Sequence, residues 1–318
     1  MKFGLHLGTR GVVARADGLR RVAQHCERLG LSHFGLSDHV IIPARTASRY
    51  PYNDSGTWPA SDTGLCLEQI TALTWAAAAT ERIRLLTSVM VLMHRPPVLA
   101  AKMLATLDVL SEGRLTLGVG VGWMAEELAV LGAPPFARRG SASDEYIRAF
   151  RSLWTQDDPV MDGEFVRFAG VRFAPKPASK LPIWIGGEGA AARRRAGRLG
   201  DGWYPVGRNP RAMLDTPALF AEALADVNRH AEAAGRSPGD IVTAMFIPWY
   251  QLGAELPRPE GGRLPFTGSA ERISEDVAAF GDQGLKHLII GFESEDLGET
   301  LDRIEQFTKE IADCCADG

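Results

Sequence analysis

Two polar residues, Asp38 and His39, stand at the end of a short strand-like segment, residues 33–39. A histidine with an ordinary pKa of about 6.5 can exchange a proton at physiological pH. We therefore predict a catalytic role for both residues, with proton transfer at His39. The simpler alternative is that Asp38 caps a loop and that His39 only contacts solvent.

A glycine-rich turn follows another strand-like segment, residues 114–117. Gly118, Gly120 and Gly122 form a GxGxG pattern, and Trp123 stands where a dinucleotide-binding GxGxxG motif needs its third glycine. The spacing therefore argues against that motif. A backbone without side chains lets a flat group approach closely, whereas the alternative is a crowded strand that needs small residues.

A second glycine pair, Gly186 and Gly187, separates a strand-like segment from a helix-like one. Residues 187–192 satisfy the looser GxGxx(G/A) form, but Asp201 comes too early to be the acid expected about 20 residues after such a motif. In either case, the N–H groups at a helix N-terminus attract phosphate. At most one or two of the arginines at positions 193–195 can reach such a site, because consecutive helical residues point in different directions.

The chain alternates strand-like and helix-like segments eight times. Eight such units are typical of a (β/α)8 TIM barrel, an α/β fold, whereas a doubly wound sheet needs fewer. In a barrel, the polar residues at the carboxyl ends of all strands meet at one mouth. We predict strands at residues 2–7, 33–39, 84–91, 114–122, 183–187, 202–206, 241–247 and 287–292.

Three longer segments are predicted to be insertions into a single domain of residues 1–318. They follow strands two, four and seven. Long loops are usually functional, so we expect the first and third to shape a substrate pocket. The insertions comprise residues 43–64, residues 125–180 with two helical patterns (124–131 and 143–154) and a hairpin (164–173), and residues 253–268.

The composition, with 45% hydrophobic and 23% charged residues, is that of a globular chain with ample core material. A net charge of −4 gives no electrostatic reason to expect a nucleic-acid or membrane partner, and no run of about 18 apolar residues occurs. The four cysteines lack metal-binding spacing, and the seven histidines are scattered. We therefore expect a cytoplasmic protein without a metal that acts on a small-molecule substrate.

The strand ends carry motifs in a fixed order: Ser37-Asp38-His39-Val40, Thr87-Ser88-Val89, His94-Arg95-Pro96-Pro97, residues 107–123, Ile183-Trp184-Ile185-Gly186-Gly187 and Gly200-Asp201-Gly202-Trp203. Together they resemble the luciferase-like monooxygenase superfamily over nearly the whole chain. Within it, they are most similar to oxidoreductases that use the deazaflavin coenzyme F420. The Arg49-Tyr50-Pro51-Tyr52 loop resembles the F420 branch more than the FMN branch.

The resemblance implies hydride transfer between the deazaflavin and an organic substrate, with a protein acid giving or taking a proton. It places Asp38 and His39 beside the reactive ring, and it implies a non-prolyl cis peptide, Ser88–Val89, behind the ring. The further cofactor-binding residues that it implies are Thr87, Gly120, Val121, Gly122 and Trp123 near the ring, and Gly186 and Gly187 at the phosphate.

One position departs from the family pattern. Some F420-dependent sugar-phosphate dehydrogenases carry a glutamate acid where this chain has Trp123. A different acid is needed here, and we predict His39, with Glu126 and Glu127 as alternatives. The departure also argues against sugar-phosphate oxidation.

Two other functions stay open. An FMN-dependent monooxygenase would activate oxygen on reduced flavin, whereas a barrel that binds a flavin-like cofactor without turnover would be a sensor or carrier. The substrate cannot be read from the sequence, because barrels differ most in their loops. Since members of the superfamily commonly form dimers, the resemblance also allows a homodimer.

Overall fold

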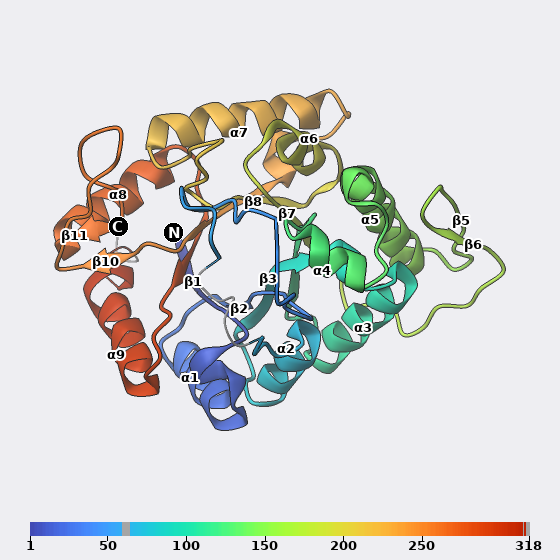
Figure 1. Ribbon diagram of the computed structural model, residues 1–318, viewed down its shortest axis with the longest axis horizontal. Helices are drawn as coiled ribbons and strands as arrows, with labels where there is room; N and C mark the ends of the chain where they lie inside the picture. Colours follow the sequence, from blue (N-terminus) through green and yellow to red (C-terminus); the bar gives the residue numbers. More distant parts are fainter. Residues whose placement is uncertain (59–63, 314, 316–318) are drawn as a thin grey trace.

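The computed structural model describes residues 1–58, 64–313 and 315, and they form a closed barrel of eight parallel strands (Figure 1). Each strand pairs with its neighbours, and the last strand returns to pair with the first. This confirms the predicted (β/α)8 TIM barrel. In order around the barrel, the strands are β1 (Lys2–Leu7), β2 (His33–Leu36), β3 (Arg84–Val91), β4 (Leu115–Gly120), β7 (Ile183–Gly186), β8 (Gly202–Tyr204), β9 (Val242–Ile247) and β12 (His287–Gly291).

Helices surround the barrel as an outer ring (Figure 1). Helix α7 shows how the local sequence sets a boundary, because the Thr216 hydroxyl accepts from the N–H of Leu219 and Pro217 takes the first helical position. The helices are α1 (Ala16–Arg28), α2 (Gln69–Ala78), α3 (Pro97–Leu110), α4 (Ala125–Val130), α5 (Arg139–Thr155), α6 (Ala190–Leu199), α7 (Pro217–Glu232), α8 (Ala270–Asp282) and α9 (Leu297–Phe307).

The segment between β4 and β7 is only partly an insertion. Helix α5 packs against α3 and α6, so it is a member of the outer ring. Its buried face, which includes Tyr146, Phe150 and Leu153, explains this position. The short antiparallel pair β5 (Met161–Asp162) and β6 (Arg167–Phe168) projects beyond the ring (Figure 1), and it starts earlier than the predicted hairpin.

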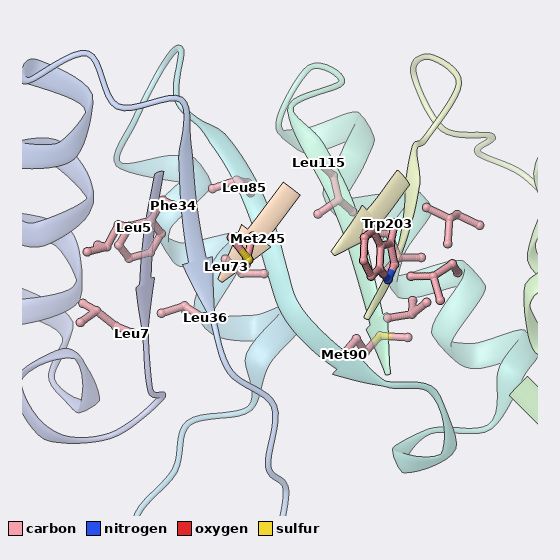
Figure 2. Packing of buried hydrophobic residues seen from close by; sticks show 14 of the residues in the cluster. Leu5, Leu7, Phe34, Leu36, Leu73, Leu85, Met90, Leu115, Trp203 and Met245 are labelled. Atoms are coloured by element: carbon pink, nitrogen blue, oxygen red, sulfur yellow. The ribbon is translucent and has the colours of Figure 1, made fainter. Parts of the chain in front are cut away.

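Two hydrophobic layers hold the barrel. Outward-facing side chains such as Leu5, Phe34 and Leu85 pack between the strands and the helices (Figure 2). Trp203 of β8 is fully buried in the same layer and stacks on Phe220 of α7, with ring centroids 5.7 Å apart. A smaller interior cluster fills the barrel itself and consists of Leu86, Trp184, Tyr204, Ala244 and Ile289.

The remaining predicted features are placed as follows. The loop after β9 contains the short strands β10 (Gln251–Leu252) and β11 (Thr267–Gly268). Cys26, Cys66 and Cys315 are free thiols, while Cys314 and residues 59–63 of the first predicted insertion lie outside the described residues. Throughout the described ranges, none of the helices combines the length and the apolar character that a membrane span requires.

Candidate active site

Asp38 lies just beyond the carboxyl end of β2 and is buried. Its carboxylate accepts hydrogen bonds of 2.8 and 2.9 Å from Nη1 and Nη2 of Arg95, and one of 3.0 Å from the N–H of Val91. Burial alone would raise the pKa of Asp38, but the Arg95 guanidinium outweighs burial and holds it well below its usual range. Asp38 is therefore a fixed anion that joins the ends of β2 and β3. Its catalytic role stays a prediction, and this geometry favours a positioning role.

His39 contacts a buried carboxylate, that of Glu127 in α4. The Nδ1 atom of His39 lies 2.7 Å from Oε2 of Glu127. His94 lies between the two acids, with Nδ1 3.3 Å from Asp38 and Nε2 3.5 Å from Glu127. Because an ionised carboxylate can only accept a hydrogen bond, Nδ1 carries the hydrogen and Nε2 is left to exchange a proton with a bound molecule. This geometry suits His39 to proton transfer.

The two glutamates of α4 hold the loop that follows β2. Oε1 of Glu127 accepts from the N–H groups of Val40 and Ile41 at 2.8 and 3.2 Å, and Oε1 of Glu126 accepts from those of Ala47 and Ser48 at 2.7 and 3.1 Å. Burial opposes the charged form of both acids, but the hydrogen bonds outweigh it, so the pKa of Glu127 is lowered and that of Glu126 falls to about 2. Acids of this kind are poor proton donors near neutral pH, which favours His39 over both alternatives.

An aromatic cluster lies beside His39 at the mouth of the barrel. The ring of Trp58 is 4.4 Å from that of His39, and Trp123 meets the edges of Tyr50 at 5.3 Å and of Trp58 at 6.2 Å. The loop that carries Tyr50 and Trp58 runs across the middle of the barrel, in blue in Figure 1. Trp123, predicted to contact the cofactor, therefore forms part of an apolar wall around the candidate base.

Strand β3 bulges into the barrel at the Ser88–Val89 bond, which is cis as the resemblance implied. The pairing with β4 shifts register here, and both side chains face the interior. A Cβ atom on Gly118 would collide with the carbonyl oxygen of Thr87, and one on Gly120 or Gly186 would lie 2.8 or 3.2 Å from a Val89 methyl group. The glycines thus make room for β3 first. We predicted that this space receives a flat ring, but Val89 of β3 occupies part of it.

Three further residues predicted to lie near the ring, Thr87, Val121 and Gly122, have different surroundings. The Thr87 hydroxyl donates to the carbonyl of Gly118 at 2.7 Å, so it is already committed. Gly122 has a φ of +79°, which explains why glycine is needed where the chain leaves β4. Val121 lies beside it, half-buried, between β4 and α4.

Ser88 belongs to a hydrogen-bonded chain that the sequence reading missed. Its hydroxyl is 2.8 Å from Nδ1 of His6 and 2.7 Å from the hydroxyl of Tyr204. Burial lowers the pKa of His6 to about 4, so this histidine is neutral at physiological pH. The available signal was a polar residue on the inward-facing side of an apolar strand, Leu5-His6-Leu7.

Gly186 and Gly187 connect β7 to α6, as predicted. Gly187 has a φ of +103°, and a Cβ there would lie 3.0 Å from the Cβ of Ala192. Gly189 precedes the helix and gives it no side-chain cap, so the first-turn N–H groups can receive an anion. The nearby arginines point elsewhere, since Arg193 pairs with Asp226 of α7 and Arg195 with Asp144 of α5.

Glu188 was also missed, although it directly follows the glycine pair. It is 2% exposed and accepts from the N–H of Val206 at 2.7 Å and from the side-chain amide of Asn209 at 2.8 Å. Burial raises its pKa, and the two hydrogen bonds oppose this only in part. A carboxyl that retains its proton more readily than usual therefore lies at the mouth.

These residues fit a phosphorylated flat cofactor. Uncapped helical N–H groups beside a glycine that a Cβ would crowd suit a phosphate, and aromatic walls beside a histidine suit a planar ring. Over the ranges that the structure describes, no three His, Cys, Asp or Glu side chains are placed to hold a metal ion.

Comparison with known proteins identifies the family of this chain. The family model described as luciferase-like monooxygenase matches residues 1–251. An uncharacterized protein of Mycobacterium tuberculosis is 36% identical over 88% of this chain and 96% of its own. An F420-dependent glucose-6-phosphate dehydrogenase of Intrasporangium calvum is 28% identical over 92% and 87% of the two chains. The structure of a riboflavin lyase with modified FMN superposes with a TM-score of 0.76 at 17% identity, covering 100% of this chain and 91% of the lyase. The match along most of the barrel shows that this chain belongs to the luciferase-like monooxygenase family.

Proposed function

We propose that this protein is an F420-dependent oxidoreductase that transfers hydride between the deazaflavin and an organic substrate. The observation that carries the proposal is the hydrogen bond from His39 to the buried Glu127 at an aromatic-lined mouth. The similarity to the Intrasporangium calvum dehydrogenase supports F420 as the cofactor. Trp123 stands where some sugar-phosphate dehydrogenases have their acid, so glucose 6-phosphate is not the substrate that we propose.

In this proposal, each group of residues has a separate role in the reaction. Bound deazaflavin supplies or accepts two electrons as hydride. Trp58 and Trp123 exclude water from the mouth, which strengthens the electrostatic interactions inside. Nε2 of His39 gives or takes the accompanying proton, and Glu127 balances the charge that forms. The N–H groups at the start of α6 hold the phosphate together with Gly187.

A parallel binding titration tests the choice of cofactor. The purified protein is titrated with F420 and with FMN, and quenching of cofactor fluorescence reports occupancy. We expect saturable binding of F420 at micromolar concentrations. FMN binding without F420 binding would reverse the assignment.

The second candidate is an FMN-dependent monooxygenase. It is favoured by the riboflavin lyase structure, which shares the fold and contains modified FMN. Deazaflavin reacts poorly with oxygen because carbon replaces nitrogen at the reactive ring position. Oxygen consumption with reduced FMN, set against anaerobic turnover with reduced F420, therefore separates the two functions.

A His39→Gln variant tests whether the barrel turns over at all. We expect cofactor binding to persist and the rate of cofactor oxidation by a panel of carbonyl compounds to fall at least 100-fold, because general acid–base catalysis contributes about that much. If the variant behaved like the wild type with every substrate that reacts, His39 would not be the acid and a sensor or carrier would become the better interpretation.

We also propose that the chain forms a homodimer, as the family resemblance allows. Helices α2 and α3 pack together and present Trp75, Val98, Leu99 and Leu110, each between 44% and 64% exposed. Burying such a face on a second copy is favourable. Sedimentation velocity should give a dimer, and Leu110→Glu should shift it toward monomer.

A further inference from the structure

Glu188 directly precedes the proposed phosphate site in the chain, and its carboxyl is buried. It is the next residue after Gly187 and the second before the first residue of α6. Like charges in a poorly hydrated region repel strongly because few water molecules screen them. An anion held by the first turn of α6 would therefore meet a second negative charge whenever Glu188 is ionised.

Among the residues that the structure describes, no Lys, Arg or His forms an ion pair with Glu188. The segment after β8 contributes only neutral donors, the N–H of Val206 and the amide of Asn209. Arg208, between those two residues, makes no ion pair in the part of the chain that the structure describes. On α6, Arg193 and Arg195 are paired with the carboxylates of Asp226 and Asp144.

The loop across the mouth adds one titratable group. Burial raises the pKa of Tyr52 well above its ordinary value, and the nearby Glu188 contributes to the rise. Tyr52 is therefore neutral over the physiological range and cannot balance the carboxylate. From the elements packed around it, Glu188 is faced by two neutral donors and a neutral phenol.

We propose that the anionic group of the cofactor and the charge of Glu188 exclude one another, so that cofactor binding is coupled to the uptake of one proton at Glu188. The inference rests on the proposed function, because it takes the phosphate to lie at α6. By linkage, affinity rises up to tenfold for each unit that the pH falls between the pKa values of Glu188 in the free and bound protein. The pKa of Glu188 is already raised by burial, which brings this window toward neutral pH.

Isothermal titration calorimetry of the full-length protein tests the coupling. F420 and FMN are each titrated at pH 6, 7 and 8 in two buffers with different ionisation enthalpies, which gives the number of protons taken up per cofactor bound. The wild type is compared with Glu188→Gln, and with Glu222→Gln as a matched control, because Glu222 is an exposed residue of α7. The phosphate monoester of FMN also titrates, with a pKa of about 6, so the difference between proteins isolates Glu188.

We expect the wild type and the Glu222→Gln control to take up a large fraction of a proton in the pH window where affinity falls. The Glu188→Gln variant should take up none beyond that of the cofactor itself, and it should bind about tenfold more tightly at pH 8. A second variant, Asn209→Ala, removes a hydrogen bond that favours the ionised form, so it should move the window to higher pH. This variant keeps the test open if Glu188→Gln does not fold.

Two results would overturn the inference. Binding of either cofactor with the same proton uptake and the same pH dependence in all the proteins would overturn the coupling and leave the proposed function standing. Failure of both F420 and FMN to bind the wild type would overturn the proposed function, and the inference with it.

Discussion

Histidines lie at both ends of the barrel, in opposite surroundings. At the mouth, His39 and His94 lie next to the carboxylates of Glu127 and Asp38. At the other end, His33 and His287 pack on each other with ring centroids 5.2 Å apart, and both contact Trp184. Burial is the main cause that lowers the pKa of both, to about 4 for His287.

This difference shows that the two ends of the barrel give histidines different partners, anionic at the mouth and aromatic at the other end. His39 has the Glu127 carboxylate 2.7 Å from its Nδ1 atom. In the described part of the chain, no carboxylate pairs with His287, and the positive charges of Lys2 and Arg84 lie nearby. The mouth therefore contains histidines beside carboxylates, an arrangement that suits proton transfer, whereas the other end is filled by histidines that stay neutral at physiological pH.

Loss of the main anion at the mouth should have the largest effect on stability. Asp38→Ala removes the bidentate partner of the buried Arg95 and leaves only Glu68 as its anionic partner, so we expect the free energy of unfolding to fall by about 3–4 kcal/mol. Urea denaturation measures the change. As a control, Asp162→Ala breaks an exposed ion pair with Arg167 and should cost little. Equal effects of the two variants would contradict the importance of the mouth network.

The bulge in β3 is a second feature confined to the mouth. Gly118→Ala would drive a methyl group against the carbonyl oxygen of Thr87, and we expect a cost of about 3 kcal/mol because the packed barrel cannot expand. Gly189→Ala serves as the control, since a Cβ there has no heavy atom within 4 Å. Thermal unfolding of both variants gives the comparison, and a Gly118→Ala protein as stable as Gly189→Ala would show that the strand can move.

The opposite end should respond to pH. The pKa of His287 is depressed in the folded state, so between pH 6.5 and about 4 the unfolded chain binds more protons and stability falls as the pH falls. One such histidine contributes about 1.4 kcal/mol per pH unit, or about 2 kcal/mol at pH 5. Denaturation at pH 7.5 and pH 5 should show a smaller pH effect in His287→Phe than in the wild type. A slope in His287→Phe equal to that of the wild type would show that His287 is not the group that titrates.

The smallest effect is expected in the hydrogen-bonded chain inside the barrel. Tyr204→Phe removes the hydroxyl that contacts Ser88 but leaves the contact between Ser88 and His6. The free energy of unfolding should fall by about 1 kcal/mol, the usual net contribution of one hydrogen bond. A loss as large as that of Asp38→Ala in the same assay would mean that the chain acts as one cooperative unit.

Much of this architecture was accessible from the sequence. The eight strands follow from apolar segments that end in glycine or polar residues, and the order of the motifs indicated the family before any contact was known. His39 was predicted to lie at the mouth because it follows the carboxyl end of a strand, where the functional residues of such barrels lie.

Other parts depended on contacts between distant segments. Glu127 lies 88 residues from the histidine that it contacts, and no local pattern joins them. The role of Asp38 depends on Arg95, which lies 57 residues away and makes the carboxylate a fixed anion. Glu188 resembled one more polar residue at a helix start, because its hydrogen-bond partners, Val206 and Asn209, lie in the segment after β8. Helix α5 was assigned to an insertion because the sequence does not state which neighbours it packs against.

The shared use of Glu127 has a consequence for timing. One of its oxygens accepts from the loop that crosses the mouth, and the other contacts His39. Withdrawal of that loop to admit a substrate would release the same carboxylate that supports the base. If His39 transfers the proton as we propose, we therefore expect transfer only while the loop and Glu127 keep these contacts.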